Sequence, residues 1–511
     1  MRLALAGGGH SNPKAGRACT IAQQSTGASA TLPPATQPAP DSDVTDLSPA
    51  SGNTAFDQLA LPAELLDNLA TLDYHTMTPI QAASLPAMLT GRDVIAQAQT
   101  GSGKTAAFGL ALLARLQVSR YRVQALVLCP TRELADQVAG EVRRLARGLP
   151  NVKVLTLCGG TPFGPQLGSL EHGAHVIVGT PGRVEEHVRK GSLKLADVNT
   201  LVLDEADRML DMGFQDQLDA IMAAVPTTRQ TLLFSATFEA NVRRIASGLM
   251  HEPVQVEVAA RDTPNTIRQH FYRIAESERL EALHTLLLYH RPESSVVFCT
   301  TKKETQEVAD ALCQRGFSAL ALHGDLEQRD RDRILVLFAQ QSASILVATD
   351  VAARGLDIDA LDAVFNYQMA RDPEVHVHRI GRTGRAGQHG MACTLVAPGD
   401  QHRVARLGDT VGQTVLEKAL PDDRELDPTP ITPTMATLQL DGGKKQKLRP
   451  GDVVGALTAG AEIHADQIGK IKVTDQSTYV AVHREVAKIA LAKLGNDRIK
   501  GRSFRVRRIS R

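Results

Sequence analysis

The stretch RDVIAQAQTGSGKTAAF, residues 92–108, contains an apolar strand-like run, a glycine-rich turn and the start of a helix-forming segment. Strand, tight glycine loop and helix are the context that a phosphate-binding loop requires. Glycine permits the backbone dihedrals and the close approach with which successive N–H groups surround a phosphate. We therefore expect a nucleotide at this turn, which consists of Thr100, Gly101, Ser102, Gly103, Lys104 and Thr105.

Two side chains of the turn have separate expected roles. Lys104 would reach the β- and γ-phosphates of ATP, and the Thr105 hydroxyl would hold Mg²⁺. Ala98 stands where the general pattern of such loops has its first glycine. The alternative is a glycine turn that carries Gly-Lys-Thr by chance, and the flanking strand and helix patterns argue against it.

A pair of carboxylates follows a second aliphatic run, in NTLVLDEADRML at residues 199–210. Ligands bind at strand ends in an open parallel sheet. Asp204 could therefore take Mg²⁺ from the side opposite Thr105, and Glu205 could orient and activate the attacking water. The alternative is an acidic turn that occurs by chance, and the preceding phosphate-binding loop argues against it.

Aliphatic runs alternate with helix-forming stretches along most of the chain, first in VQALVLCP, VKVLTLCGG, HVIVGTP and TLLFSAT. A second series contains SSVVFCTTK, ALALHGD, ASILVATDVA, DAVFNYQM and MACTLVAP, without a phosphate-binding loop of its own. Such alternation predicts α/β domains whose parallel sheets are covered on both faces. We expect two of them, one with nucleotide machinery and one without.

The second series also contains HRIGRTGRAG, residues 378–387, in which Arg379, Arg382 and Arg385 are spaced three apart. The glycines predict a loop rather than a helix. An arginine supplied by a neighbouring domain can stabilise the charge on a transferring γ-phosphate. That role would require closure of the cleft between the domains. Simple anion binding or surface charge is the alternative.

Positive charge is concentrated at the C-terminal end of the chain, which closes with KGRSFRVRRISR. From residue 444 onward there are sixteen Lys or Arg against six Asp or Glu, although the formal net charge of the whole chain is only +1. This segregation favours a domain that meets a polyanion, and a solvated basic surface is the alternative.

The same end has a predictable order of elements. A first segment near 452–457 precedes a helix near Ala465, strands at 469–473 and 478–482, a helix at 484–494 and a strand at 503–509. This order resembles an RNA-recognition (RRM-like) fold, a small sheet backed by two helices. Because the stretch STYVAV offers only one aromatic, Tyr479, we expect basic residues to do more of the binding. The candidates are Lys470, Lys472, Arg505 and Arg507.

Eight motifs together resemble the DEAD-box ATP-dependent RNA helicases. They are TPIQ (78–81), AQTGSGKT (98–105), PTRELA (130–135), TPGR (180–183), DEAD (204–207), SAT (235–237), ATDVAARGLD (348–357) and HRIGRTGR (378–385). The resemblance covers roughly residues 54–420 in the order and spacing of that family. It implies two tandem RecA-like domains that use ATP and Mg²⁺ and bind RNA.

The resemblance also implies roles for individual residues. Gln81 would read the adenine edge with Phe56 stacked on the ring, Asp357 would hold the ribose, and Arg382 and Arg385 would act as arginine fingers. Asp207 would hydrogen-bond Ser235 or Thr237 and so couple hydrolysis to domain closure. Contacts to the RNA backbone would come from Arg132, Gly160, Thr180, Arg183, Gln328, Arg331 and Thr349, and such contacts position a strand without reading its sequence.

The segments RPGDVVGALT, IGKIKV, TYVAV and IKGRSFRVR resemble the C-terminal domain of the DbpA-type bacterial helicases. That resemblance implies binding to large-subunit (23S) ribosomal RNA and a role in ribosome assembly on pre-ribosomal particles. An ATP-controlled RNA clamp or assembly scaffold is an alternative from another class, because the same closed state would grip RNA in both cases. A motor that acts on DNA is a third, and 2′-hydroxyl contacts would distinguish it.

The predicted organisation is a disordered extension (1–52), an ATP-binding domain (53–260), a second helicase domain (261–420), a linker (421–446) and the RRM-like domain (447–511). The extension is rich in Ala, Ser, Thr, Pro and Gly, which favours disorder over a targeting segment. No apolar run approaches the ~18–20 residues that span a bilayer. We expect a cytoplasmic protein without a membrane partner, and a monomer is favoured.

Overall fold

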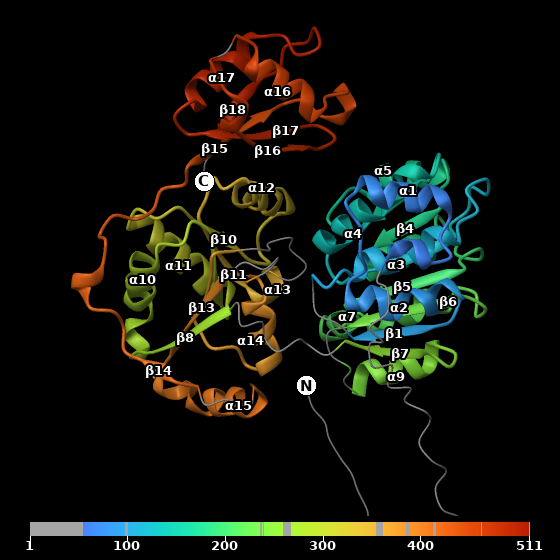
Figure 1. Cartoon of the computed structure of the whole chain (residues 1–511), viewed down its shortest axis with the longest axis horizontal. Coiled ribbons are helices and arrows are strands. Elements are labelled where there is room, and N and C mark those ends of the chain that lie inside the picture. The colour runs from blue at the N-terminus through green and yellow to red at the C-terminus, as the bar shows by residue number, and fades with distance from the viewer. Residues whose placement is uncertain are drawn as a thin grey trace, which may run out of the picture. The chain divides into compact units, whose positions relative to one another are not determined.

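The computed structural model describes residues 55–97, 101–235, 238, 240–258, 267–353, 361–384, 389–411, 415–460 and 462–509. Within these residues there are two seven-stranded sheets and one four-stranded sheet (Figure 1). We call residues 55–258 the first lobe, residues 267–427 the second lobe, and residues 435–509 the terminal domain. The predicted extension lies outside the described residues. No helix among the described residues is long and apolar enough to cross a membrane.

The first lobe is built on a parallel sheet whose strand order is β3-β4-β2-β5-β6-β1-β7. Its strands are β1 (Val94–Gln97), β2 (Ala125–Leu128), β3 (Val154–Leu157), β4 (Val176–Gly179), β5 (Thr200–Asp204), β6 (Gln230–Ser235) and β7 (Val254–Glu257). Side chains alternate between the faces, so Val94 and Ala96 join one buried cluster while Ile95 joins the other. Both faces are therefore covered, as the aliphatic runs predict.

The helices of the first lobe lie on both faces of its sheet (Figure 1). They are α1 (Ala63–Thr71), α2 (Pro79–Leu89), α3 (Lys104–Ala114), α4 (Arg132–Leu145), α5 (Phe163–Glu171), α6 (Pro181–Arg189), α7 (Ala206–Asp211), α8 (Gln215–Met222) and α9 (Ala240–Leu249).

The second lobe is also a parallel sheet with helices, in the order β10-β11-β9-β12-β13-β8-β14. Its strands are β8 (Ile267–Arg273), β9 (Ser295–Cys299), β10 (Ala319–Leu322), β11 (Ile345–Thr349), β12 (Ala363–Asn366), β13 (Gly390–Val396) and β14 (Glu417–Lys418). Its helices are α10 (Arg279–His290), α11 (Lys302–Gln314), α12 (Gln328–Ala339), α13 (Asp350–Ala353), α14 (Pro373–Ile380) and α15 (Gln401–Val411).

The two lobes have the same strand order when their strands are numbered in chain order. β8 corresponds to β1, which leads into the phosphate-binding loop, and β12 corresponds to β5, which ends in the acidic pair. The helices that follow β1 and β8 begin at Lys104 and Arg279, respectively. Arg279 is buried and forms ion pairs with Glu276 at 2.7 Å and Asp400 at 2.9 Å. The second lobe thus neutralises a cation internally at the position where the first lobe has the lysine of its loop.

The terminal domain is an antiparallel sheet in the order β16-β17-β15-β18 with two α-helices. Its elements are β15 (Met435–Leu440), α16 (Pro450–Thr458), β16 (Ile468–Val473), β17 (Thr478–His483), α17 (Ala487–Asn496) and β18 (Val506–Ile509). The βαββαβ order confirms the predicted RRM-like fold.

One boundary is wrong. The segment predicted as a linker, 421–446, contains β15, an inner strand of this sheet between β17 and β18. The last proline of this segment is Pro433, and the MATLQL run that follows Thr434 is almost entirely buried. Ala436, Leu438 and Leu440 of this strand belong to the buried cluster of the terminal domain, which explains the apolar run. Near Ala465 the predicted helix is only a short 3₁₀ turn, Ala465–Gln467.

Candidate functional site

The glycine-rich turn lies between β1 and α3, as predicted. Gly101 and Gly103 have φ angles of +81° and +96°, in the region that L side chains rarely adopt. A Cβ at Gly103 would lie 2.6 Å from Gln81 Nε2, so side-chain packing also requires glycine there. Lys104 and Thr105 begin α3, and Lys104 is buried. Thr100 lies outside the described residues.

Gln81 and Thr78 connect α2 to the backbone of this turn. Gln81 Nε2 donates to the carbonyl of Gly103 at 3.1 Å, and its Oε1 accepts from the Thr78 N–H at 2.8 Å. Thr78 Oγ1 donates to the carbonyl of Ser102 at 2.7 Å. The side chain expected to read adenine therefore also fixes the position of the loop that would hold the phosphates.

Three motifs meet at one edge of the first sheet. β6 pairs with β1 on one side, where Ser235 is opposite Gln97, and with β5 on the other, where Phe234 is opposite Asp204. Because these strands are parallel, their carboxyl ends share that edge, which is where open α/β sheets bind ligands. Ser235 thus ends the strand that lies between the loop strand and the acidic strand.

Asp204 and Glu205 are both almost fully buried at this edge. Among the described residues, neither Asp204 Oδ1 nor Glu205 Oε2 has a hydrogen-bond partner. Burial raises the pKa of Asp204 to about 6, the Lys104 charge opposes that shift, and Glu205 adds to it. Glu205 has a φ of +52°, a conformation unusual for a residue with a side chain. Glu205 Oε2 lies 3.9 Å from Arg208 Nε, so the buried oxygen that best fits a divalent cation is Asp204 Oδ1.

Two further site predictions for the first lobe, at Phe56 and Asp207, stay predictions. Phe56 is buried, and its ring packs edge-on against Tyr74 with centroids 6.2 Å apart, so stacking on adenine stays a prediction. Asp207 Oδ1 accepts from the Arg208 N–H at 3.0 Å. Its expected bond to Ser235 stays a prediction, and Thr237 lies outside the described residues.

Four predicted RNA contacts of the first lobe lie at element ends or turns. Arg132 begins α4 and Thr180 precedes α6. Gly160 has a φ of +72°, and a Cβ there would overlap the Arg132 guanidinium. Within the described chain, Arg132 Nε and Nη1 are buried without hydrogen-bond partners. Such donors fit a phosphate oxygen.

Arg183, the fourth predicted contact, is held by its neighbours. Its Nη1 donates to Gln166 Oε1 at 2.8 Å and to the Thr161 carbonyl at 3.0 Å, and its Nε lies 3.0 Å from Glu186. Gln166 also contacts the fully buried His187, whose Nε2 is 3.0 Å from Gln166 Oε1. Sequence reasoning missed Gln166, because nothing in its local pattern marks it.

In the second lobe, Thr349 ends β11 and Gln328 begins α12. Gln328 Nε2 donates to Asp332 at 2.8 Å, and Arg331 Nη1 donates to the His323 carbonyl at 3.4 Å. Arg382 is buried just after α14. Asp357 and Arg385 lie outside the described residues, so their roles stay predictions.

Arg379 corrects one expectation, because it lies in helix α14 and not in a loop. Proline at the start of this helix has a preset φ, and the first glycine follows its last residue. Arg379 Nε and Nη2 donate to the two oxygens of Asp350 at 2.6 and 2.8 Å, and Nη1 donates to Asn366 Oδ1 at 3.1 Å. This buried arginine therefore connects α13, α14 and the end of β12.

The terminal domain presents a polar row across all four strands. Lys472 is opposite Tyr479, Tyr479 is opposite Gln439, and Gln439 is opposite Arg507. Neighbouring positions such as Leu438, Leu440 and Val480 point into the buried cluster of this domain, so the row lies on the opposite face of the sheet. Lys472 and Arg507 are exposed, and so are the other two predicted contacts, Lys470 and Arg505.

Three family descriptions match the chain. Residues 78–245 match the DEAD/DEAH box helicase family, residues 278–387 the helicase conserved C-terminal domain, and residues 437–508 the DbpA RNA binding domain. The last match begins within β15.

Curated relatives and solved structures agree with these matches. The chain is 54% identical over 455 residues to the ATP-dependent RNA helicase DbpA of Escherichia coli (strain K12), covering 89% of this chain and 99% of the relative. It is 46% identical over 357 residues to the DEAD-box ATP-dependent RNA helicase CshA of Geobacillus kaustophilus (strain HTA426), covering 69% and 76%. S. cerevisiae Dbp5 bound to RNA and ADP BeF3 matches with a TM-score of 0.64 and 31% identity, covering 72% of this chain and 96% of that chain.

Proposed function

The chain belongs to the DEAD-box family of ATP-dependent RNA helicases, and we propose that it separates short RNA duplexes by ATP-driven closure of its two lobes. We further propose that the terminal domain directs it to large-subunit ribosomal RNA during ribosome assembly. The match of residues 437–508 to the DbpA RNA binding domain supports RNA binding by the terminal domain, and the resemblance to the DbpA-type helicases is the ground for this choice of RNA. The cytoplasm as its location and a monomeric state belong to the same proposal.

The observation that carries the hydrolytic part is the buried pair Asp204 and Glu205, which shares a sheet edge with the phosphate-binding loop. Among the described residues Asp204 Oδ1 has no hydrogen-bond partner. Asp204 and Thr105 would hold Mg²⁺, which neutralises phosphate charge when it is bound with ATP. Glu205 would orient the attacking water and accept its proton. Lys104 would hold the β- and γ-phosphates through its ammonium group.

Closure would bring the arginines of the second lobe to the γ-phosphate. Arg382 and Arg385 would stabilise the charge that develops there. Arg379 would keep α14 in position through its bidentate pair with Asp350. ATP favours the closed state only if it binds that state more tightly, so release of phosphate would reopen the cleft.

The test is ATP turnover by the full chain with large-subunit ribosomal RNA, with mRNA-like RNA and without RNA. A chain that ends at Asp427, before β15, tests the terminal domain. Selective stimulation that the truncation abolishes would support the proposal, and equal stimulation by every RNA would refute the specificity. Displacement of a labelled strand from a short duplex separates a helicase from an RNA clamp, because a clamp binds in an ATP-dependent manner without releasing the strand.

A further inference from the structure

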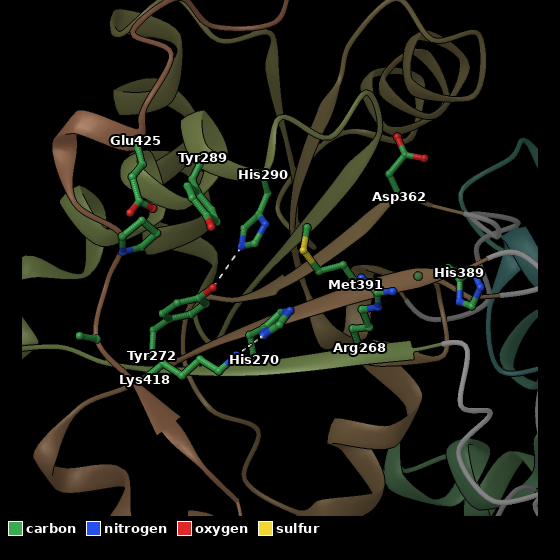
Figure 2. A pocket seen from close by; sticks show the side chains of 13 residues that line it. Arg268, His270, Tyr272, Tyr289, His290, Asp362, His389, Met391, Lys418 and Glu425 are labelled. Atoms are coloured by element: carbon green, nitrogen blue, oxygen red, sulfur yellow. Dashed lines mark hydrogen bonds between the residues drawn. The ribbon is translucent and has the colours of Figure 1, made fainter.

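The second lobe contains a pocket of about 570 Å³ that no step above uses (Figure 2). One wall is a face of β8, on which Arg268, His270 and Tyr272 alternate with residues that point the other way. The end of α10 contributes Tyr289 and His290, and the edge strand β14 contributes Lys418. A volume of this order lies within the range of small-molecule sites.

The pocket is separate from the edge where the second lobe carries its helicase motifs. Thr349 and Asn366 mark that edge, since they are the last residues of β11 and β12. The pocket instead includes Gly390, the first residue of the parallel strand β13, and the C-terminal end of α10. It therefore reaches the amino ends of the strands.

Polar side chains of the pocket contact one another in pairs. Tyr272 Oη lies 3.1 Å from His290 Nε2, and Lys418 Nζ lies 3.4 Å from His270 Nδ1, as Figure 2 shows. Because an ammonium group can only donate, Nδ1 of His270 accepts and the imidazole is neutral in this arrangement. The His270 and His290 rings lie nearly parallel, with centroids 5.9 Å apart.

The surroundings of these histidines are positive. Burial, with smaller contributions from His270 and Lys418, lowers the pKa of His290 to about 4. Burial also lowers the pKa of His270, and Lys418 and Arg268 add to that effect. Within the described part of the chain, no ion pair joins Arg268 or Lys418 to a carboxylate. The Lys418 side chain thus lies beside the His270 ring without a carboxylate partner among the described residues.

Two carboxylates also line the pocket, Asp362 and Glu425. Asp362 Oδ2 accepts from the Ser294 N–H at 2.9 Å, and Figure 2 shows Asp362 on the side away from Lys418. At the rim, the ring of Tyr289 is 41% exposed and stands nearly perpendicular to His290. The pocket thus combines cations with an accessible aromatic face.

We propose that this pocket binds a nucleotide unit, with its phosphate at Arg268 and Lys418 and its base against Tyr289. Arginine and lysine bind phosphate, and stacking on an aromatic ring is available to every base. The nucleotide unit has two sources, a free mononucleotide or one unit of an RNA strand. This site does not depend on the ATP chemistry of the first lobe.

The experiment maps photo-crosslinks on the full chain. Two probes are used, 4-thiouridine monophosphate and a single-stranded RNA that contains one 4-thiouridine. The variants are Lys418→Gln and Arg268→Gln. Both wild-type side chains are exposed, so their loss should leave the melting temperature unchanged. Lys303→Gln is the matched control, because Lys303 is 85% exposed on α11, pairs only with Glu307 on its own helix among the described residues, and lies outside the pocket.

We expect crosslinked peptides from β8 and the end of α10. The labelling affinity should be about threefold to tenfold weaker in the two variants than in the control, as for loss of one hydrogen bond of typical net strength. Displacement by unlabelled UMP at low concentration identifies a free nucleotide, and labelling by RNA that UMP does not displace identifies a strand. The proposal is overturned if neither probe labels these peptides. It is also overturned if inorganic phosphate displaces the probes as well as UMP does, because the base would then contribute nothing.

Discussion

Asp204 and Asn366 end corresponding strands of two sheets that have equal strand order, Asp204 at the end of β5 and Asn366 at the end of β12. Asn366 Nδ2 donates to Thr394 Oγ1 at 2.9 Å, and its Oδ1 accepts from Arg379 at 3.1 Å. Asp204 Oδ1 is buried without a hydrogen-bond partner among the described residues. At the end of β5 the first lobe thus keeps an oxygen without a partner among the described residues, whereas the polar side chain that ends β12 is paired within the second lobe.

Replacing Glu205 with Gln removes the carboxylate that we expect to activate water. RNA-stimulated ATP turnover should fall by about 10²-fold or more, as for loss of a general base. Binding of ATP should remain, since the amide keeps the size of the side chain. Steady-state turnover and titration of a fluorescent ATP analogue measure the two effects. Asp216→Asn changes an exposed acid on α8 and should leave both unchanged, and normal turnover in the Gln variant would contradict the role.

Replacing Gln81 with Ala removes the two hydrogen bonds that it makes with Thr78 and Gly103. Each bond contributes about 0.5–1.5 kcal/mol, so we expect KM for ATP to rise by roughly tenfold. The measurement is turnover against ATP concentration. Gln255→Ala on the exposed part of β7 is the matched control. A change in kcat alone would show that Gln81 does not act by holding the loop.

Lys472→Gln and Tyr479→Ala test the polar row of the terminal domain. Each should weaken binding to a large-subunit ribosomal RNA fragment, and the lysine variant should reduce the slope of log affinity against log salt by about one. Fluorescence anisotropy at several salt concentrations measures both quantities. Lys488→Gln lies on α17, which packs on the other face of the sheet, and should bind as the wild type does. Equal weakening in all three variants would point to non-specific charge.

The position of β15 predicts where the terminal domain can be cut. A fragment of residues 428–511 should fold, whereas a fragment of residues 444–511 lacks an inner strand and should not. Leu438 and Leu440 of that strand are fully buried, and their loss would expose the apolar face of the helices. Circular dichroism and the dispersion of amide proton resonances report the outcome. A folded shorter fragment would mean that β15 is dispensable.

His376 predicts acid sensitivity of the second lobe. It is buried beside Gln269, with His376 Nε2 3.0 Å from Gln269 Oε1, and burial lowers its pKa from 6.5 to about 4. The unfolded chain therefore binds more protons between these two values, so stability is present above pH 6.5 and is lost as the pH falls toward 4. The loss from this group has a limiting slope of about 1.4 kcal/mol per pH unit.

Denaturant midpoints above and within this pH window test the effect. His376→Gln should flatten the pH dependence, because glutamine does not titrate. The exposed His402→Gln should leave it unchanged. An equally steep dependence in the His376 variant would assign the acid sensitivity to other buried histidines.

The sequence predicted the features whose chemistry is local. The loop at Gly101 to Thr105 and the pair Asp204 and Glu205 follow from strand, glycine and carboxylate patterns. Residues that act through distant partners left no such pattern. Asp350 and Arg379 meet across 29 positions of the chain, and β15 was hidden because its short apolar run follows a proline-rich segment. Register across a sheet depends on partners elsewhere in the chain, so the row from Lys472 to Arg507 became visible only in the fold.

The two lobes differ in the hydrogen bonding of their buried polar side chains, and this difference affects their thermal stability. A buried polar group without a partner lowers the free energy of unfolding by about 1–3 kcal/mol. The ligand-free first lobe is therefore less stable than the same lobe with a bound ligand that satisfies this group. The second lobe, in which Arg279 and Asn366 are paired internally, carries no such cost at these two side chains. Heating should therefore unfold the first lobe before the second. Saturation with nucleotide should reduce the difference between their melting temperatures, because a ligand that binds only the folded state raises the melting temperature.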